Sequence, residues 1–381
     1  MIVVVVVDCF VDTSNGTAVS ANNLVNTLRG KGHIVRVVAP YVNGKDCYSL
    51  KERYIPFVTE KSRKQRTHFG LPDRDILKEA FKGADIIHLF LPFHLEIVGL
   101  KIAKEMGIPF ISAFHLQPEH ITYNSKLLSH IPYINKFIFW LFHFRFYRHA
   151  KYIHCPSELI KKELEDNGYK NNLFVISNGF NSSFTALKKE KNKEDDFFHI
   201  VMTGRYSHEK RQDLLIEAIK LSKYENKIKL HLKGSGPKEK EYKNLAKALS
   251  NDVSFGFVSK EELAILYSKV DLYVHTSDVD GEAIATLEAL ASGLVPIISD
   301  SKLSATKQFA LDNRSLFEAG NALDLSRKID FFIENKHLLE SLGEKYAASV
   351  SKYDLSSCVD KMIDMYEMVI RSTRSTSEFQ S

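Results

Sequence analysis

Short apolar runs alternate with amphipathic helical segments along almost the whole chain of 381 residues. In the first such unit, an apolar run at 2–7 precedes a helical pattern at 17–29 and a second apolar run at 34–39. Apolar residues at i, i+3, i+4 and i+7 mark the helix, and the strand–helix–strand order predicts parallel strands covered on both faces by helices. Further strands are predicted at 86–90, 109–113, 151–155, 173–176, 198–203, 228–233, 272–275 and 294–299.

The almost wholly charged stretch LKKEKNKEDD divides this pattern into two series. A chain of this length suits two domains, so we predict doubly wound, Rossmann-like α/β domains at 1–187 and 197–352, joined by a charged linker at 188–196. A solvated loop within one domain is the alternative for this stretch. The last residues predict a long helix at 353–371 and a disordered polar tail at 372–381.

Overall charge and cysteine content limit the classes of function. The formal net charge is +5 and the pI is about 8.7, which is too weak by itself to indicate nucleic-acid binding but suits an anionic substrate or membrane surface. Four scattered cysteines without a CxxC spacing argue against zinc and a disulfide framework and favour a reducing cytosol. The opening MIVVVVVD lacks the basic residues of a signal peptide, and no run approaches the ~20 apolar residues of a membrane span.

Two carboxylates mark the segment DGEAIATLEALASG, in which Asp280 and Glu288 are eight residues apart. We expect a strand at 272–275, a polar loop, and a helix at 282–292, whose N-terminus offers free backbone N–H groups to anions and sugar hydroxyls. Acidic residues also favour the first turn of a helix for electrostatic reasons, which would explain Asp280. That alternative does not explain Glu288, because a carboxylate in an apolar stretch needs a partner.

Two cations follow the first strand of the second domain. The segment TGRYSHEK places Arg205 and Lys210 in a turn at the carboxyl end of the predicted sheet, where ligands bind in such folds. A guanidinium and an ammonium at this edge suit a diphosphate. Isolated surface cations usually carry no function, and this stays the alternative.

In the first domain, a glycine loop and a histidine are the candidate binding groups. The loop DCFVDTSNG contains Gly16 but no GxGxxG pattern, so it is not a dinucleotide fingerprint, and it could be a plain turn. Gly16 would still let a phosphate or hexose approach the backbone before a helix. His115 follows a predicted strand and is either a site residue or a structural histidine. His88, inside a strand, fits the core better, and Glu119 with His120 are weaker candidates for the site.

Two segments suggest a membrane surface. KSRKQR at 61–66 is a basic loop, and KFIFWLFHFRFYRHAK at 136–151 is both aromatic and basic. The second is too short to span a bilayer but could lie in its interface. The alternative is an ordinary helix packed on a sheet, with its cations simply exposed.

With these motifs in view, nearly the whole chain resembles the family 4 retaining glycosyltransferases, which have the two-domain GT-B fold. The segments that carry the resemblance are NGTAVSANNLVNTLRGKGHIVRVVAP, TGRYSHEKRQDLLIEA, GSGP and LEALASGLVPII, in the family's order. Bacterial diacylglycerol glucosyltransferases and capsule or lipopolysaccharide transferases look most similar. The resemblance implies an acceptor-binding first domain, a nucleotide-sugar-binding second domain, and a terminal helix that returns to the first.

The resemblance also implies roles for individual residues. Arg205 and Lys210 would bind the donor diphosphate beside Gly16, Glu288 would bind the ribose, and His115 would bind the donor sugar near its reacting face. Asp280 stands where the family usually has Glu, and GEA replaces GFG. The contact with the donor sugar therefore falls to Asp280 or, through Gly281, to Glu282. The loop after PIIS, DSKLSATKQ, lacks the family's usual glycines.

The activity implied is transfer of a hexose, with retention, from a nucleotide sugar (a UDP-sugar) to an alcohol on a membrane lipid or lipid-linked glycan. No metal and no cofactor are expected, and the partners are the donor, the lipid acceptor and an anionic membrane surface, without nucleic acid. The expected location is cytoplasmic, peripheral on the inner face of the membrane. A nucleotide-sugar 2-epimerase on the same fold and a non-catalytic nucleotide-binding relative are the alternatives.

Overall fold

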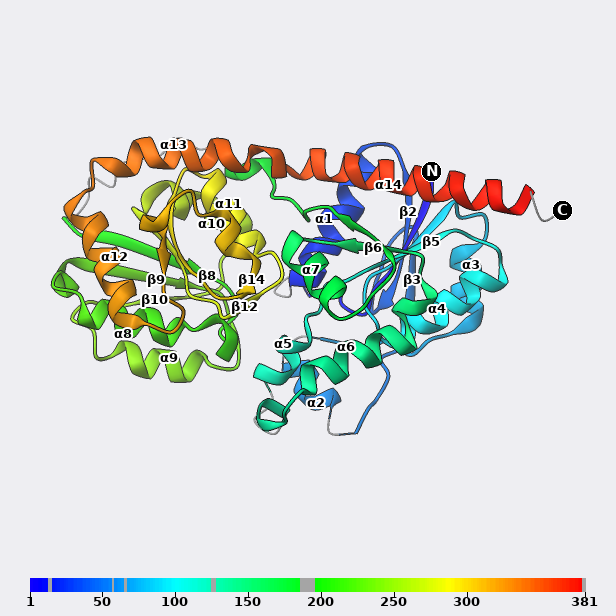
Figure 1. Cartoon of the computed structure of the whole chain (residues 1–381), viewed down its shortest axis with the longest axis horizontal. Coiled ribbons are helices and arrows are strands. Elements are labelled where there is room, and N and C mark those ends of the chain that lie inside the picture. The colour runs from blue at the N-terminus through cyan, green and yellow to red at the C-terminus, as the bar shows by residue number, and fades with distance from the viewer. Residues whose placement is uncertain (13–15, 57, 65–66, 125–127, 186–195, 379–381) are drawn as a thin grey trace. The chain divides into compact units, whose positions relative to one another are not determined.

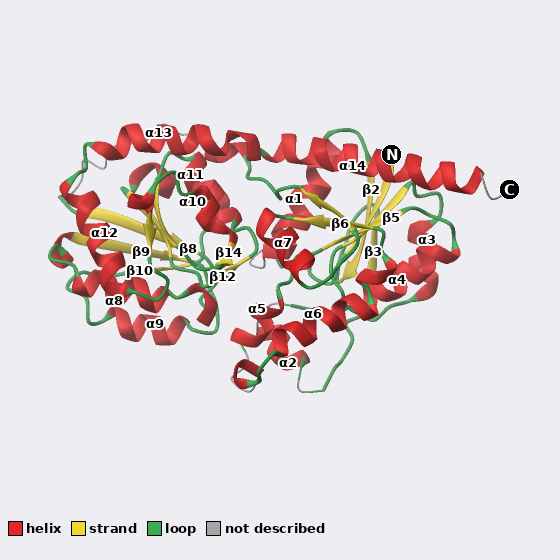
Figure 2. Cartoon of the chain, in the orientation of Figure 1, coloured by secondary structure: helices red, strands yellow, loops and turns green. Residues whose placement is uncertain are grey.

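The chain forms two compact units, each built around its own parallel sheet (Figures 1 and 2). A computed structural model describes residues 1–12, 16–56, 58–64, 67–124, 128–185 and 196–378. The first unit comprises Met1–Asn178 and Leu355–Ser381, and the second comprises Gly179–Asp354. The observed boundary therefore lies at Asn178, earlier than the predicted 187. The predicted linker at 188–196 lies almost entirely outside the described residues.

The first unit is a seven-stranded parallel sheet with the order β3-β2-β1-β4-β5-β6-β7. Its interior strand β1 carries an uninterrupted valine run that is buried on both faces, as an interior parallel strand requires. The elements are β1 (Ile2–Val6), α1 (Gly16–Gly30), β2 (Ile34–Pro40), β3 (Cys47–Leu50), α2 (Thr59–Lys64), α3 (Arg74–Phe81), β4 (Ile86–Leu89), α4 (His94–Glu105), β5 (Phe110–Ala113), α5 (Pro118–Tyr123), α6 (Ile134–Arg145), β6 (Tyr152–Cys155), α7 (Glu158–Asp166) and β7 (Asn172–Val175).

The C-terminal helix α14 (Leu355–Glu378) belongs to the first unit, as the family resemblance predicts. Val359, Met362 and Tyr366 are buried in the same hydrophobic cluster as the strand residues Val3 and Val5. This packing closes one face of the sheet with a segment distant in sequence. The helix also continues to Glu378, so the predicted end at 371 and the disordered tail at 372–378 are wrong.

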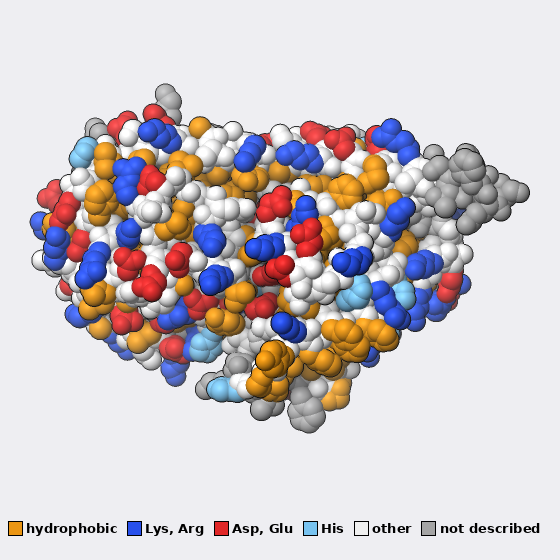
Figure 3. All heavy atoms as spheres, viewed as in Figure 1, with side chains coloured by type: hydrophobic (Ala, Val, Ile, Leu, Met, Phe, Trp, Pro, Cys, Tyr) orange, Lys and Arg blue, Asp and Glu red, His pale blue; other side chains and the backbone are white. Residues whose placement is uncertain are grey.

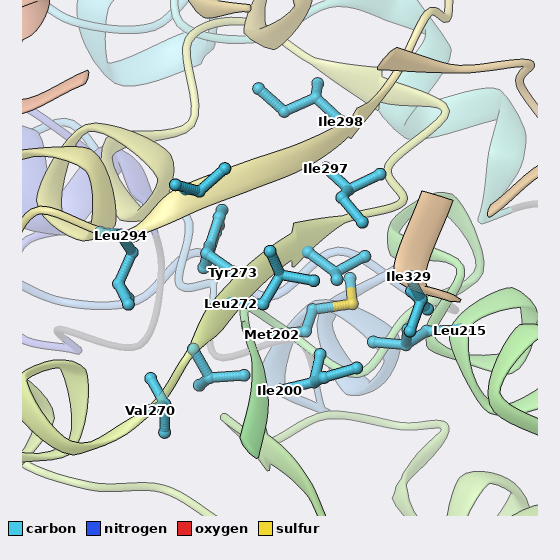
Figure 4. Close-up of a cluster of buried hydrophobic side chains, with 14 of the residues drawn as sticks. Ile200, Met202, Leu215, Val270, Leu272, Tyr273, Leu294, Ile297, Ile298 and Ile329 are labelled. Atoms are coloured by element: carbon cyan, nitrogen blue, oxygen red, sulfur yellow. The ribbon is translucent and has the colours of Figure 1, made fainter. Parts of the chain in front are cut away.

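The second unit has a six-stranded parallel sheet, β10-β9-β8-β11-β13-β15, and a separate pair of short strands, β12 and β14. Aliphatic side chains from the sheet and from α8 and α12 pack into one core, including Ile200, Leu215, Leu272 and Ile329 (Figure 4). The elements are β8 (Phe198–Thr203), α8 (Gln212–Leu221), β9 (Ile228–Lys233), α9 (Glu239–Ala246), β10 (Ser254–Gly256), α10 (Lys260–Lys269), β11 (Leu272–His275), β12 (Val279–Asp280), α11 (Ile284–Ala291), β13 (Val295–Ser299), β14 (Leu303–Ser304), β15 (Leu316–Phe317), α12 (Ala322–Glu334) and α13 (Leu338–Val350).

Candidate functional site

The loop between β8 and α8, which carries the two predicted cations, is held by a glycine turn. Tyr206 N–H donates to Ser235 O at 3.0 Å. A Cβ on Gly234 would lie 2.0 Å from Gly204 O, and one on Gly236 would lie 2.5 Å from Tyr206 O. The two backbones approach so closely that these two positions require glycine. The turn therefore fixes the loop at the carboxyl end of the sheet, where such folds bind ligands.

Arg205 is held by a carboxylate that the sequence did not single out. Its Nη2 lies 2.8 Å from Oε1 of Glu209, which is buried. The Arg205 side chain stays 26% exposed, and its guanidinium has further N–H donors for a ligand. A pre-positioned guanidinium of this kind loses little entropy when it binds a phosphate.

Lys210 and Asp280 form an ion pair in the second unit, although they are far apart in sequence. His275, at the end of β11, places its Nε2 3.2 Å from the same Asp280 oxygen. Burial by itself would raise the pKa of Asp280, but the positive charge of Lys210 and the contact with His275 outweigh it and hold the pKa far below its usual range. Burial lowers the pKa of His275 despite the nearby carboxylate, so this imidazole is neutral at pH 7. His275 was not predicted, although a strand that ends in histidine at this sheet edge is a visible signal.

Asp280 lies in a short strand that precedes the helix. In this strand, β12, it pairs with Ser304 of β14. Helix α11 begins at Ile284 and ends at Ala291, so the predicted span of 282–292 is too long at both ends. Ala283, the residue before the helix, adopts the left-handed conformation with φ 58° and ψ 75°, so the helix cannot begin earlier. Gly281 and Glu282, the other predicted contacts, occupy the short link, and both have interaction partners within the protein.

Ala283 stores backbone strain that a glycine would release. A left-handed conformation costs an L-residue roughly 1–2 kcal/mol, and glycine avoids this cost. Glycine also raises the conformational entropy of the unfolded chain, which offsets part of the gain. Ala283→Gly should therefore raise the free energy of unfolding by about 0.5–1 kcal/mol in denaturant titrations. The matched control is Ala285→Gly inside α11, which should lower it by about 0.5–1 kcal/mol. Destabilisation by both substitutions would contradict the left-handed assignment.

Glu288 is a carboxylate buried in α11 and only 6% exposed. No side-chain hydrogen bond to it is present among the described residues. Burial raises the pKa of Glu288 to about 7, against the opposing charge of Lys260. The charges of Asp280 and Glu288 both raise the pKa of the buried Tyr273, so the two carboxylates lie near the same ring. The cost of leaving such a carboxylate uncompensated is consistent with a ligand that binds it.

The candidate residues of the first unit lie at the starts and ends of its elements. Gly16 is the first residue of α1, and a Cβ built there meets no atom of the described residues within 4 Å. His115 follows β5 and stacks on Phe90 with ring centroids 5.0 Å apart. Its Nε2 has no hydrogen-bond partner among the described residues. Burial, helped by nearby His154, holds the pKa of His115 well below its usual range, so it is a neutral imidazole able to bind a hydroxyl group.

The remaining candidates are placed as follows. His88 is fully buried, and its Nδ1 contacts Tyr366 OH of α14 at 2.8 Å, which confirms it as a core histidine. Glu119 is buried in α5, and burial raises its pKa. His120 is half-buried on the same helix. Among the residues that the structure covers, no cluster of His, Cys, Asp or Glu is arranged to hold a metal ion.

Two family profiles match consecutive parts of the chain. The profile described as "Glycosyltransferase Family 4" matches residues 14–184, and "Glycosyl transferases group 1" matches residues 183–348. Together with the two Rossmann-like units, these matches define the class: the chain belongs to the group 1/family 4 glycosyltransferases of the GT-B fold, and it is a glycosyltransferase.

Individual proteins of known name extend this likeness. An alpha-monoglucosyldiacylglycerol synthase from Streptococcus pneumoniae is 28% identical over 312 residues, which cover 77% of this chain and 69% of that protein. The catalytic domain of the cholesterol-alpha-glucosyltransferase from Helicobacter pylori is 53% identical over 41% of this chain and 98% of its own, with a TM-score of 0.40. The structure of HepE from Anabaena in complex with UDP-glucose superimposes with a TM-score of 0.72 at 16% identity, covering 97% of this chain and all of that one.

Proposed function

We propose that this glycosyltransferase moves a hexose from a UDP-sugar to the free hydroxyl of a membrane lipid, with diacylglycerol as the acceptor and with retention at the anomeric carbon. The Lys210–Asp280 ion pair at the carboxyl end of the second sheet carries this proposal. It supplies a fixed cation for the diphosphate and a carboxylate for the sugar within one contact. The name of the Streptococcus pneumoniae relative supports the acceptor, and the UDP-glucose bound to the structurally similar HepE supports the donor.

The proposed chemistry needs no protein nucleophile. The bond from the anomeric carbon to the diphosphate breaks, a bond from the acceptor oxygen forms on the same face, and the hydroxyl proton passes to the leaving diphosphate. Charge develops on the diphosphate oxygens, so Arg205 and Lys210 would stabilise the transition state more than the ground state. Glu288 would accept hydrogen bonds from the ribose hydroxyls. No metal is included in this scheme.

Helix α6 supports an acceptor in a membrane, because one of its faces carries exposed aromatic rings. Tyr133, Phe137, Trp140 and Phe144 follow each other at helical spacing and are 80%, 54%, 54% and 45% exposed. The three rings within the helix stack at 5.7 and 5.3 Å between centroids. We call these four residues the α6 aromatic face. Hydrophobic side chains gather over α6 in Figure 3, as expected for a helix that lies in a membrane interface.

Exposed cations flank the α6 aromatic face. Arg148 places its guanidinium 4.1 Å from the ring centroid of Phe144, and Lys136 and Arg145 are exposed on the same helix. The opposite face is buried in the unit, so the packed-helix interpretation describes that face, and we propose the interfacial one for the exposed face. Peripheral binding at the inner face of the membrane remains our proposal. Among the described helices, none combines the length and the apolar character needed to cross a bilayer.

The second basic segment contributes less than the sequence suggested. Residues Thr59–Lys64 form the short helix α2 instead of a loop, while 65 and 66 lie outside the described residues. The Arg63 guanidinium is already paired with Glu52, through Nε at 3.0 Å among other contacts. A paired cation attracts anionic lipid less, so α6 is expected to dominate membrane binding.

Membrane binding can be measured by sedimentation with vesicles. We expect binding to anionic vesicles that weakens as salt is raised, because the flanking cations act on the surface potential. Replacing Phe137, Trp140 and Phe144 together by serine should weaken this binding by roughly tenfold or more, since apolar burial is lost. Phe257→Ser, which removes an exposed aromatic ring from the second unit, is the matched control and should change nothing. Equal binding to neutral and anionic vesicles, or binding to neither, would refute the proposal.

A donor and acceptor screen tests the proposed function. The purified protein is incubated with each common nucleotide sugar, with and without vesicles containing diacylglycerol, a sterol or a polyprenyl-linked sugar, and nucleoside diphosphate release is followed. We expect release that requires both UDP-glucose or a related UDP-sugar and diacylglycerol. Release of an epimerised nucleotide sugar without any acceptor would favour the epimerase, and donor binding without turnover would favour the non-catalytic relative.

A further inference from the structure

A polar pocket in the first unit lies at the carboxyl end of β1 and β2, and none of the residues assigned to the donor lines it. It has a volume of about 250 Å³. A ligand pocket for a whole drug-sized molecule has roughly 300–1,000 Å³, so this one suits the polar end of a larger molecule. The residues that line it are Asp8, Cys9, Phe10, Val11, Asp12, Pro40, Tyr41 and His68.

Asp8 is the buried polar group of this pocket. It is 2% exposed, and its Oδ2 has no hydrogen-bond partner among the described residues. Its Oδ1 accepts a hydrogen bond from the Gly70 N–H. A Cβ on Gly70 would lie 2.9 Å from Leu95 Cδ2 and 3.3 Å from Asp8 Oδ1, so the close approach of this N–H depends on glycine. The carboxylate is therefore held in one orientation by the backbone.

Glu96, in the first turn of α4, forms a carboxyl pair with Asp8. It is fully buried, and neither of its oxygens has a hydrogen-bond partner among the described residues when both groups are ionised. Burial raises the pKa of both carboxyls, that of Asp8 to about 6, where Gly70, Glu96 and Arg53 oppose the increase. The charge of Asp8 raises the pKa of Glu96 further, well above its usual range. At neutral pH the proton of the pair thus lies on Glu96, whose O–H donates a hydrogen bond to the Asp8 carboxylate.

The rim of the pocket carries two exposed apolar or aromatic side chains beside the polar Asp12 and His68. Val11 and Tyr41 are 56% and 49% exposed, and Tyr41 is held in a left-handed conformation with φ 60°. The Tyr41 ring packs edge-on against His68 with centroids 5.4 Å apart, while its hydroxyl reaches Glu52 at 3.2 Å. A buried hydrogen-bond acceptor with exposed apolar side chains beside it matches a lipid that carries one hydroxyl group.

We propose that this pocket binds the hydroxyl-bearing end of the lipid acceptor, with the Asp8 carboxylate, held by Gly70 and Glu96, accepting a hydrogen bond from a lipid hydroxyl. The inference rests on the proposed function, since it assumes a lipid alcohol as substrate. Each carboxylate oxygen accepts two hydrogen bonds, so Asp8 can serve Glu96 and the lipid together. The apolar body of the lipid then lies along Val11 and Tyr41.

The test compares two isosteric amides. In Asp8→Asn, the carbonyl oxygen stays on the Gly70 N–H, and an NH₂ group replaces the oxygen that accepts the lipid hydroxyl. In Glu96→Gln, an N–H donor to Asp8 is retained, as in the protonated acid. With UDP-glucose and dioctanoylglycerol as probes, the KM for dioctanoylglycerol should rise roughly tenfold or more in Asp8→Asn and stay within about twofold in Glu96→Gln. The KM for UDP-glucose should stay unchanged in both, as in the exposed control Glu105→Gln.

The other outcomes overturn the inference. An unchanged dioctanoylglycerol KM in Asp8→Asn, or a rise confined to the UDP-glucose KM, excludes the pocket as the lipid site. If Asp8→Asn and Glu96→Gln lose activity equally and both unfold at lower midpoints, Asp8 and Glu96 stabilise the fold and do not bind the lipid. If Asp8→Asn does not fold, Val11→Trp at the exposed rim should raise the dioctanoylglycerol KM alone, and no rise there overturns the inference. If the wild-type protein releases no nucleoside diphosphate in response to lipid, the proposed function is refuted, and this inference with it.

Discussion

Replacing Lys210 by alanine should lower kcat by roughly 10²- to 10³-fold, the usual effect of removing one pre-positioned group that stabilises developing charge. The substitution also leaves Asp280 buried without its cation, beside a neutral His275. Loss of one partner of a buried pair costs about 3 kcal/mol or somewhat less here, since Lys210 is 17% exposed. A lower free energy of unfolding is therefore expected together with the loss of turnover, both measured at neutral pH.

The double variant Lys210→Ala/Asp280→Asn separates these two effects. Removal of both charges should restore most of the stability but none of the turnover. Lys243→Ala, which breaks an exposed ion pair with Glu239 on α9, should change neither quantity. Full turnover in the single variant with an intact fold would show that Lys210 does not bind the diphosphate.

Glu288→Gln should make the protein without donor more stable and should weaken its binding of the donor. The pKa of Glu288 is about 7 in the fold, against an ordinary value of 4.5, because burial disfavours the charge. A raised pKa means that stability is highest below pH 4.5, falls as pH rises from 4.5 to 7, and stays lower above pH 7. The difference between these two values corresponds to about 3 kcal/mol. The glutamine variant should therefore gain up to about 3 kcal/mol over the wild type at pH 8 and about nothing at pH 4.

The same substitution should weaken donor binding. Glutamine cannot accept hydrogen bonds from two ribose hydroxyls as a carboxylate does, so a rise of roughly tenfold or more in the donor Kd is expected from calorimetry. Glu217→Gln, on the exposed face of α8, is the control for both measurements. A Glu288→Gln variant that binds the donor normally, or whose stability follows the wild type at every pH, would contradict the role given to this carboxylate.

The fold could be predicted because its central strands are long and apolar on both faces. The run at 2–7 and the helix at 17–29 appear in the structure as β1 and α1 with small shifts at their ends. The short edge strands β3 and β10 were missed, since CYSL and SFG are half-exposed and carry no apolar run. The boundary at Asn178 was also misplaced, because the charged stretch that drew attention lies a few residues later in the chain.

The candidate site was predictable where residue type and position coincide. Arg205 and Lys210 stand directly after a strand, and Glu288 is a carboxylate in an apolar helix. The left-handed Ala283 was not predictable, since alanine favours helix and tertiary contacts override that preference. The pair of Asp8 and Glu96 depends on the packing of α4 beside β1, which no local pattern in the sequence records.

The central claim, retaining transfer of a hexose to a lipid alcohol, is tested most directly by the anomeric configuration of the product. The lipid formed from UDP-glucose and diacylglycerol is isolated, and the configuration of its new glycosidic bond is read from the proton NMR coupling between H1 and H2. The account predicts an α-linked glucosyl lipid, the same configuration as in the donor. A β-linked product, or a nucleotide sugar that changes while no glycolipid forms, would contradict it.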